Sequence, residues 1–293
     1  MKGRILKGIG GFYYVHIEEN DKIYECRARG IFRKDGKKPL VGDLVEMDVI
    51  DETEATGNVS EILERKNALI RPAVANVDQA LVIFAAASPD PLPGLLDRFL
   101  IRMNYARVPV KVCINKIDLN DAFNEFASIY RDSGIEFVFI SAIENEGIEE
   151  MKEILQNKVT TLAGPSGVGK STLINALTGE DLRRTGDVSK KLKRGKQTTT
   201  SSELIELDKD TFIIDTPGFS SLDIPELKPE ELADCYREFD DYKNNCFYNG
   251  CSHTHEPDCG VSGAVKDGLI DKIRYESYVT IYEELLKKQK HRF

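Results

Sequence analysis

The chain has 293 residues, 41% of them hydrophobic and 30% charged, which is enough material for the cores of two or three domains. Its net charge of −9 excludes a uniformly basic coat for nucleic acid, although Lys and Arg gather at residues 22–38, 183–196 and 287–293. No apolar run approaches the roughly 18 residues of a membrane span, and no signal-peptide core is present, so we expect a cytoplasmic protein that does not bind membranes.

The first domain, residues 1–65, is predicted to be a small β-barrel. Runs rich in aromatic and β-branched residues at 11–17 and 22–28 indicate two strands on either side of a polar turn. A bent strand pair is expected over 40–50 and another strand over 57–63. Four or five short strands fit an oligonucleotide-binding (OB) barrel, and periodicity leaves an SH3-like barrel open as the alternative.

The second domain, residues 66–225, alternates buried strands with amphipathic helices. The predicted strands are 80–86, 108–114, 136–141, 159–164, 203–207 and 211–215. The predicted helices are 95–106, 122–134, 147–156 and 170–179. Such alternation is typical of a largely parallel α/β sheet, in which ligands bind beyond the carboxyl ends of the strands.

Residues 164–171, GPSGVGKS, match the phosphate-binding loop pattern G-x-x-x-x-G-K-[ST] in full. The glycines let backbone N–H groups surround phosphate oxygens at the N-terminus of the following helix. Lys170 is expected to reach the β- and γ-phosphates, and Ser171 to bind Mg²⁺. A predicted strand before the loop and a predicted helix after it supply the context that this motif requires.

The sequence NKID at 115–118 follows a predicted strand, where a base-reading loop belongs. Asp118 would accept hydrogen bonds from the ring N–H and the amine of guanine, which adenine does not offer in that arrangement. Asn115 would brace the loop and contact the base, and the stem of Lys116 would lie along its face. Ser141 and Ala142, at the end of the next strand, would offer backbone N–H groups to the guanine carbonyl.

The sequence DTPG at 215–218 ends the last predicted strand of this domain. Asp215 would hold the magnesium shell, and the amide of Gly218 would sense the γ-phosphate. Phe219 follows, where Ras-like enzymes carry a glutamine that positions water. Because a phenyl ring does not orient water, we expect slow hydrolysis that another segment or a partner completes.

These motifs occur in the reverse of the usual order, with base reading before phosphate binding. The ends of a compact domain often lie close together, so a chain can be joined there and reopened in another loop. Each motif still ends its own strand, which predicts a circularly permuted GTPase domain. The DTPG segment leads directly into the third domain, which indicates a switch whose output is that domain.

The third domain, residues 226–293, begins with a predicted polar helix over 229–242 and ends with a predicted helical tail over 261–290. Between them, Cys246, Cys251, His253 and Cys259 form a Cys3His set that would complete the tetrahedral shell of one structural zinc ion. His255 is an alternative imidazole ligand, and three free buried thiols are the alternative to a metal site. The short loop has little apolar material to bury free thiols, which favours zinc.

The order NKID, SA, GPSGVGKS, TTT and DTPG, with a barrel before it and a Cys3His loop after it, resembles the ribosome small-subunit-dependent GTPase family (RsgA/YjeQ). The resemblance covers essentially the whole chain. It implies a multi-domain α/β protein with an OB-like barrel, a circularly permuted P-loop GTPase domain and a helical zinc-binding domain. It also implies binding to the 30S ribosomal subunit and its 16S rRNA, late maturation of that subunit, and weak GTP hydrolysis that the subunit stimulates.

The motif matches assign roles residue by residue. The catalytic residues are Lys170, Ser171, Thr199, Asp215 and Gly218. The GTP-binding residues are Asn115, Lys116, Ile117, Asp118, Ser141, Ala142, Gly164, Pro165, Ser166, Gly167, Val168, Gly169, Lys170, Ser171 and Thr172. Magnesium is assigned to Ser171 and Thr199, with Thr198 and Thr200 as alternatives to Thr199. Gln197 stands where the family usually has histidine, which leaves the water-orienting residue open.

Two other classes of function compete with this interpretation. A P-loop ATPase or kinase would share the phosphate loop, but Asp118 argues against adenine. A non-catalytic RNA-binding module would keep the nucleotide as a structural filler. We expect the protein to be a monomer, and the three basic clusters on an acidic protein favour a polyanionic partner, above all RNA.

Overall fold

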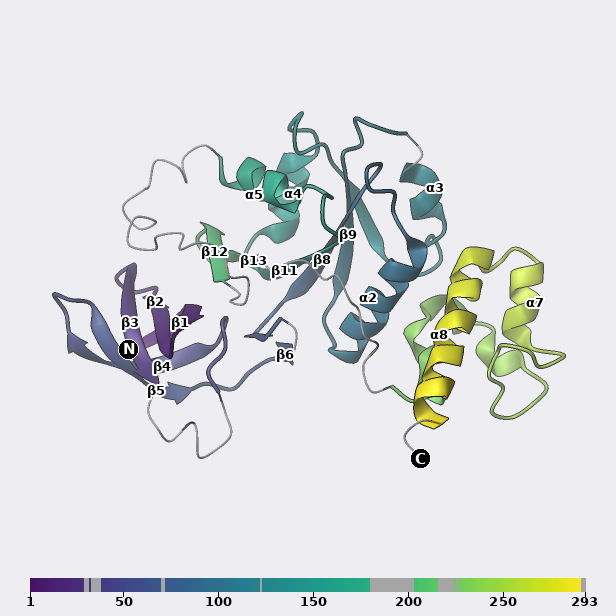
Figure 1. Ribbon diagram of the computed structural model, residues 1–293, viewed down its shortest axis with the longest axis horizontal. Helices are drawn as coiled ribbons and strands as arrows, with labels where there is room; N and C mark the ends of the chain where they lie inside the picture. Colours follow the sequence, from purple (N-terminus) through teal and green to yellow (C-terminus); the bar gives the residue numbers. More distant parts are fainter. Residues whose placement is uncertain are drawn as a thin grey trace. The chain divides into compact units, whose positions relative to one another are not determined.

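A computed structural model of the chain describes residues 1–28, 32, 38–69, 72–121, 123–179, 203–215, 224 and 227–290 (Figure 1). The backbone forms two compact units. Unit 1 consists of Met1–Leu81, Gly147–Gly164 and Lys170–Phe219, and unit 2 consists of Val82–Glu146, Pro165–Gly169 and Ser220–Phe293. Every helix within the described ranges falls short of the length or the apolarity that crossing a membrane demands.

Unit 1 begins with a closed five-stranded barrel, seen at the N-terminal end of the chain in Figure 1. Its strands are β1 (Lys2–Ile9), β2 (Phe12–Ile17), β3 (Lys22–Ala28), β4 (Leu44–Asp51) and β5 (Thr56–Ile62). They lie in the order β1-β2-β3-β5-β4, and a β1–β4 pairing closes the ring. Inward-facing apolar side chains fill it, among them Ile5, Val15, Tyr24, Met47 and Val59. The predicted OB-like barrel is confirmed.

Two strand predictions in the barrel need correction. β1 is not among the predicted strands, because lysines and glycines break up the apolar pattern of KGRILKGI. The expected strand pair over 40–50 is a single strand, β4. Before it, Val41 forms only an isolated bridge with Val74, and Gly42 turns the chain at φ 90°.

Asp43, at the turn before β4, anchors the barrel to the segment that leaves it. The carboxylate is fully buried and accepts two hydrogen bonds from Arg65, at 2.7 and 2.8 Å, and one from the backbone N–H of Leu40 at 2.7 Å. The Asp43→Asn variant loses the charge opposite a guanidinium and presents an amide NH2 group, a second donor, to it. We expect the barrel to lose about 2 kcal/mol of its free energy of unfolding.

Hydrogen exchange of the β1–β5 amides measures this loss, because local exchange reports local unfolding. The exposed Glu54→Gln variant makes the same carboxylate-to-amide change without a buried partner and should exchange like the unmodified chain. Wild-type exchange rates in the Asp43→Asn barrel would contradict the anchoring role.

Unit 1 continues with strands and helices of the second domain. These are β6 (Ala68–Leu69), β7 (Val74–Ala75), the start of β8 (Gln79–Ala85), α4 (Ile148–Leu155), β11 (Val159–Ala163), α5 (Lys170–Thr178), β12 (Glu203–Asp208) and β13 (Thr211–Asp215). β11 and β13 are parallel, whereas β12 and β13 form an antiparallel hairpin. The other edge of β12 pairs with β1 of the barrel. Barrel and hairpin therefore belong to one sheet.

Unit 2 takes up β8 and continues with α2 (Pro93–Tyr105), β9 (Val110–Asn115), α3 (Phe123–Ser128) and β10 (Glu136–Phe139). All seven residues of β8 are buried, and β9 and β10 are parallel, as the unbroken apolar runs predict. Its C-terminal part contains three short 3₁₀ helices, η2 (Pro229–Cys235), η3 (Arg237–Phe239) and η4 (Lys243–Asn245), and then α7 (Gly260–Lys266) and α8 (Lys272–Lys290).

The C-terminal part differs from the sequence prediction in two places. Residues 229–242 do not form one α-helix: the chain forms two short 3₁₀ helices, η2 and η3, because Tyr236 between them has an extended backbone with φ −116° and ψ 92°. The predicted tail is two helices, because Gly268 takes the left-handed conformation, with φ 74°, just after α7.

Arg274 joins α8 to α2 and to η3 inside unit 2. Its guanidinium forms ion pairs with Asp97 and with Glu238, the latter at 2.6 Å, and is 2% exposed. It also lies over the rings of Tyr130 and Tyr236, 4.8 and 4.4 Å from their centroids. Burial raises the pKa of the Asp97 carboxyl, although the charge of Arg274 acts in the opposite direction. The charge of Arg274 therefore offsets part of the free-energy cost of burying the Asp97 carboxylate.

Candidate functional site

The phosphate loop connects β11 to α5. Gly164, Gly167 and Gly169 have φ angles of 145°, 85° and 92°, a region that residues with a Cβ disfavour. At Gly169 a Cβ would lie 2.3 Å from Nδ2 of Asn115, so this position has no room for a side chain. Lys170 donates from Nζ to the carbonyl of Gly164 at 2.7 Å, across the loop. The backbone thus has the tight curvature that surrounds a phosphate.

Lys170, Ser171 and Thr172 form the first turn of α5. Ser171 and Thr172 are exposed, as are Ser166 and Gly167 in the loop before them. Backbone N–H groups of a first helical turn have no partner within the helix and carry the positive end of its dipole. Together with the Lys170 ammonium, this end of α5 suits an anionic ligand.

The NKID loop is hydrogen-bonded to the phosphate loop within unit 2. Asn115, buried at the end of β9, donates from Nδ2 to the carbonyl of Val168 at 2.9 Å. Its Oδ1 accepts from the backbone N–H groups of Lys116 at 2.8 Å and of Ala142 at 3.1 Å. One side chain thereby holds together the NKID, SA and GPSGVGKS segments.

Asp118 is exposed at the end of this loop. Its Oδ1 accepts a hydrogen bond of 2.5 Å from the hydroxyl of the buried Ser141, which fixes the orientation of the carboxylate. Lys116 has φ 64° and donates from Nζ to the carbonyl of Ser88 at 2.6 Å. Ser88 is not among the predicted site residues, since a backbone carbonyl contact leaves no mark on the sequence.

The β11–β13 pairing brings the end of β13 to the edge of the sheet where the phosphate loop begins. Val159 lies opposite Phe212 and Thr161 opposite Ile214, so the carboxyl ends of the two strands coincide and Asp215 is the next residue of β13. The described part of the structure includes the backbone of Asp215 but not its side chain. Outside it altogether lie Gln197, Thr199, Gly218, Phe219, the basic cluster 183–196 and most of the basic residues of 22–38.

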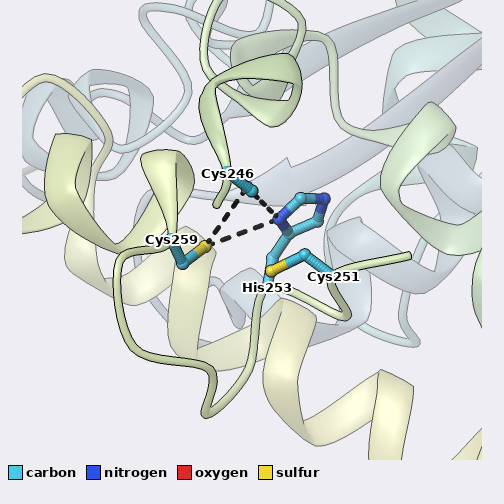
Figure 2. A group of neighbouring side chains, drawn as sticks. All are labelled: Cys246, Cys251, His253 and Cys259. Atoms are coloured by element: carbon cyan, nitrogen blue, oxygen red, sulfur yellow. Dashed lines mark hydrogen bonds between the residues drawn. The ribbon is translucent and has the colours of Figure 1, made fainter. Parts of the chain in front are cut away.

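The four predicted metal ligands converge on one point (Figure 2). Cys246 follows η4, Cys251 and His253 lie in the loop after it, and Cys259 immediately precedes α7. Their ligand atoms all lie within 4.8 Å of one another. His255 points elsewhere: it is exposed, and its Nδ1 is hydrogen-bonded to the hydroxyl of Thr254.

Three of the four ligand atoms have the mutual spacing of a tetrahedral zinc shell, and the sulfur of Cys251 lies within 4.8 Å of each of them. Zn–S bonds of about 2.3 Å place two sulfur ligands roughly 3.8 Å apart. The sulfurs of Cys246 and Cys259 are 3.8 Å apart, and they lie 3.4 and 3.5 Å from Nδ1 of His253. Backbone N–H groups of Gly260 and Ser262 donate to these two sulfurs at 3.4 Å, which stabilises thiolate. The donor set and its spacing fit zinc.

Glu256 organises the loop that carries the ligands. Its carboxylate accepts from the backbone N–H groups of Ser252, Thr254 and His255, at 2.8 to 3.3 Å. Burial acts to raise the pKa of this carboxyl, but the hydrogen bonds outweigh it and lower the pKa to about 2. Glu256 is not among the predicted residues; the acidic side chain within HTHEPDC is the signal that could have indicated it.

Comparison with known proteins places the chain in a family. Residues 62–225 match the family model for the RsgA GTPase, and residues 2–56 match the model for the RsgA N-terminal domain. The chain belongs to the RsgA GTPase family. Members of this family hydrolyse GTP, so the predicted enzyme class and the predicted family are confirmed.

RsgA relatives match over nearly their entire length. The protein from Agathobacter rectalis named "Small ribosomal subunit biogenesis GTPase RsgA" is 51% identical, over 99% of this chain and 100% of its own. The protein of the same name from Caldanaerobacter subterraneus subsp. tengcongensis is 45% identical, over 100% and 98%. The similarity therefore extends over nearly the whole of this chain and of these relatives.

Two solved structures share this fold. The crystal structure of YjeQ from Thermotoga maritima has a TM-score of 0.81 and 36% identity, covering 97% of this chain and 98% of its own. YloQ, described as a circularly permuted GTPase, has a TM-score of 0.79 and 34% identity, covering 98% and 95%. This similarity confirms the circular permutation that the motif order predicts.

Proposed function

We propose that the chain is a GTPase of small ribosomal subunit biogenesis, which binds the 30S subunit and its 16S rRNA late in maturation. Relatives that match it from end to end carry that function in their names. The observation that carries the nucleotide assignment is the Asn115–Val168 hydrogen bond, because it joins a guanine-type loop to a phosphate loop. Intrinsic hydrolysis is slow and the subunit stimulates it.

The proposed nucleotide contacts follow the motifs. Asp118 reads guanine, Asn115 and Lys116 support the base, and the amides of Ser141 and Ala142 face its carbonyl. The backbone of residues 164–169 binds the phosphates with Lys170 and Thr172. Mg²⁺ is held by Ser171 and Thr199, with Asp215 in its outer shell, and the amide of Gly218 senses the γ-phosphate.

The proposed architecture has three domains, at residues 1–65, 66–225 and 226–293. The barrel binds RNA, and Cys246, Cys251, His253 and Cys259 hold one zinc ion that stabilises the C-terminal domain without taking part in catalysis. The protein acts in the cytoplasm as a monomer.

Release of phosphate from GTP, measured with purified small subunits, large subunits and assembled ribosomes, tests this function. We expect small subunits to raise the rate and large subunits to leave it unchanged. The Lys170→Ala variant controls for contaminating GTPases. ATP hydrolysed as readily as GTP would indicate an ATPase or kinase instead, and binding of small subunits without any hydrolysis would indicate a non-catalytic module.

A further inference from the structure

Strand β1 of the barrel changes its edge partner halfway along its length. Lys2, Gly3 and Arg4 pair with β4 and close the barrel. The register of β1 against β2 then shifts between Ile5 and Lys7, an irregularity of the β-bulge type, which re-aims the side chains beyond it. Past this shift, Lys7 pairs with Glu203 of β12. The second half of β1 is therefore a docking edge for β12.

Side chains reinforce this edge at two points. Nζ of Lys7 lies 2.9 Å from Oε2 of Glu203; the side chain of Lys7 is 14% exposed and that of Glu203 40%, so solvent reaches this ion pair mainly from the Glu203 side. The guanidinium of Arg4 lies 5.3 Å from the ring centroid of Phe212, a buried residue of β13. Two cations of β1 thus contact the two strands of one hairpin.

The hairpin brings the contacted residues next to the proposed magnesium site. Glu203 is the first residue of β12, and its register partner on β13 is Asp215. Lys7, Glu203 and Asp215 therefore follow one another across three adjacent strands. In the sequence, Glu203 comes four residues after Thr199, the second proposed magnesium ligand. Lys7 is thus linked through Glu203 to the backbone of Asp215.

We propose that Lys7, a residue of the barrel, is a positioning residue for GTP hydrolysis, which acts through Glu203 on the placement of Asp215. The inference rests on the proposed function, in which Asp215 supports Mg²⁺ and the barrel binds RNA. RNA bound to the barrel and Mg²⁺ bound beside Asp215 would then both act on the three paired strands β1, β12 and β13. The two binding sites are coupled through these strands.

Charge removal and charge reversal test the pair. In Lys7→Met and in Glu203→Gln, we expect the turnover stimulated by small subunits to fall about three- to tenfold, and the basal turnover to fall less. The double variant should be no worse than the more impaired single variant. The reversed pair, Lys7→Glu with Glu203→Lys, should recover most of the stimulated rate, which a loss of folding would not do.

A matched control is the Lys66–Asp78 ion pair, which also has a length of 2.9 Å and lies in unit 1, but does not involve β12. Lys66→Met should retain the stimulated rate. Additive losses in the double variant, an uncorrected reversed pair, or equal losses of basal and stimulated turnover would overturn the role of Lys7. A wild-type chain that small subunits do not stimulate would instead refute the proposed function.

Discussion

Replacement of Asp118 by asparagine is expected to lower the affinity for GTP roughly a thousandfold, because two hydrogen bonds to a charged acceptor contribute about 1.5–3 kcal/mol each. Asparagine keeps one acceptor atom, but its amide NH2 group is a donor and cannot accept a hydrogen bond from guanine. Xanthine has a carbonyl where guanine has its amine, so the same variant should gain affinity for xanthosine triphosphate.

Displacement of a fluorescent guanine nucleotide by GTP, ATP and xanthosine triphosphate measures this change. Asp121→Asn is the matched control, since it removes an exposed carboxylate three residues further along the same loop. Ser141→Ala should have a smaller effect. It removes the 2.5 Å hydrogen bond that orients Asp118, and we expect it to lower the affinity for GTP about fivefold. Undiminished GTP affinity in Asp118→Asn would disprove the base-reading assignment.

Substitution of Cys251 by serine is expected to remove the zinc ion and to unfold the loop of residues 246–259 selectively. A structural zinc contributes on the order of 10 kcal/mol or more to the folding of a small metal-binding module. The loop contributes little to the apolar core of unit 2, since only Cys259 and the partly buried Cys246 and Cys251 pack there, so apolar burial does not replace the metal. Metal analysis after purification without chelators, combined with hydrogen exchange, separates metal loss from general unfolding.

Cys235→Ser is the control for this substitution, because Cys235 is half-buried in the same part of unit 2 but lies outside the metal cluster. It should keep one zinc ion per chain. A wild-type protein that is fully ordered and contains no zinc would rule out the metal site.

Zinc retention should also depend on pH in a definite direction. Burial raises the pKa of the Cys251 thiol to about 12, and the pKa of Cys259 is raised as well, so both thiols carry protons at neutral pH until metal displaces them. Each displaced proton lowers the apparent affinity about tenfold for each pH unit of acidification. Titration with a chelator at pH 8 and pH 6 measures this slope, and an affinity that does not change with pH would contradict thiolate ligation.

The sequence predicts the positions of the site residues better than it predicts the tertiary contacts that hold them in place. Each motif lies at the end of a strand with a strong apolar run, so a local pattern is sufficient to place Asn115, Gly164 and Asp215. The Cys3His ligands lie within fourteen residues, and His253, which is buried, joins them, whereas His255 is exposed. The domain boundaries and the residue roles at the nucleotide site stay predictions.

The contacts that sequence reasoning does not find join distant segments. Lys7 and Glu203 are 196 residues apart, and no periodicity relates β1 to β12. The polar stretch 229–242 satisfies a helical pattern locally, but the folded chain interrupts it at Tyr236, whose side chain is buried in the core of unit 2 with Phe239 and Tyr278. Such pairings depend on tertiary geometry, which local propensity does not encode.

The buried contact between Arg274 and Asp97 also bears on how the chain is made. The two residues are 177 positions apart, and synthesis at 5–20 residues per second separates their appearance by roughly 9–35 s. The five barrel strands are complete by Ile62, so the barrel can close early. Until Arg274 has been synthesised, the Asp97 carboxylate of unit 2 has no cationic partner and stays hydrated. A chain truncated before Arg274 would therefore contain a folded barrel and an α2 helix whose burial is unfavourable, because Asp97 lacks its cation.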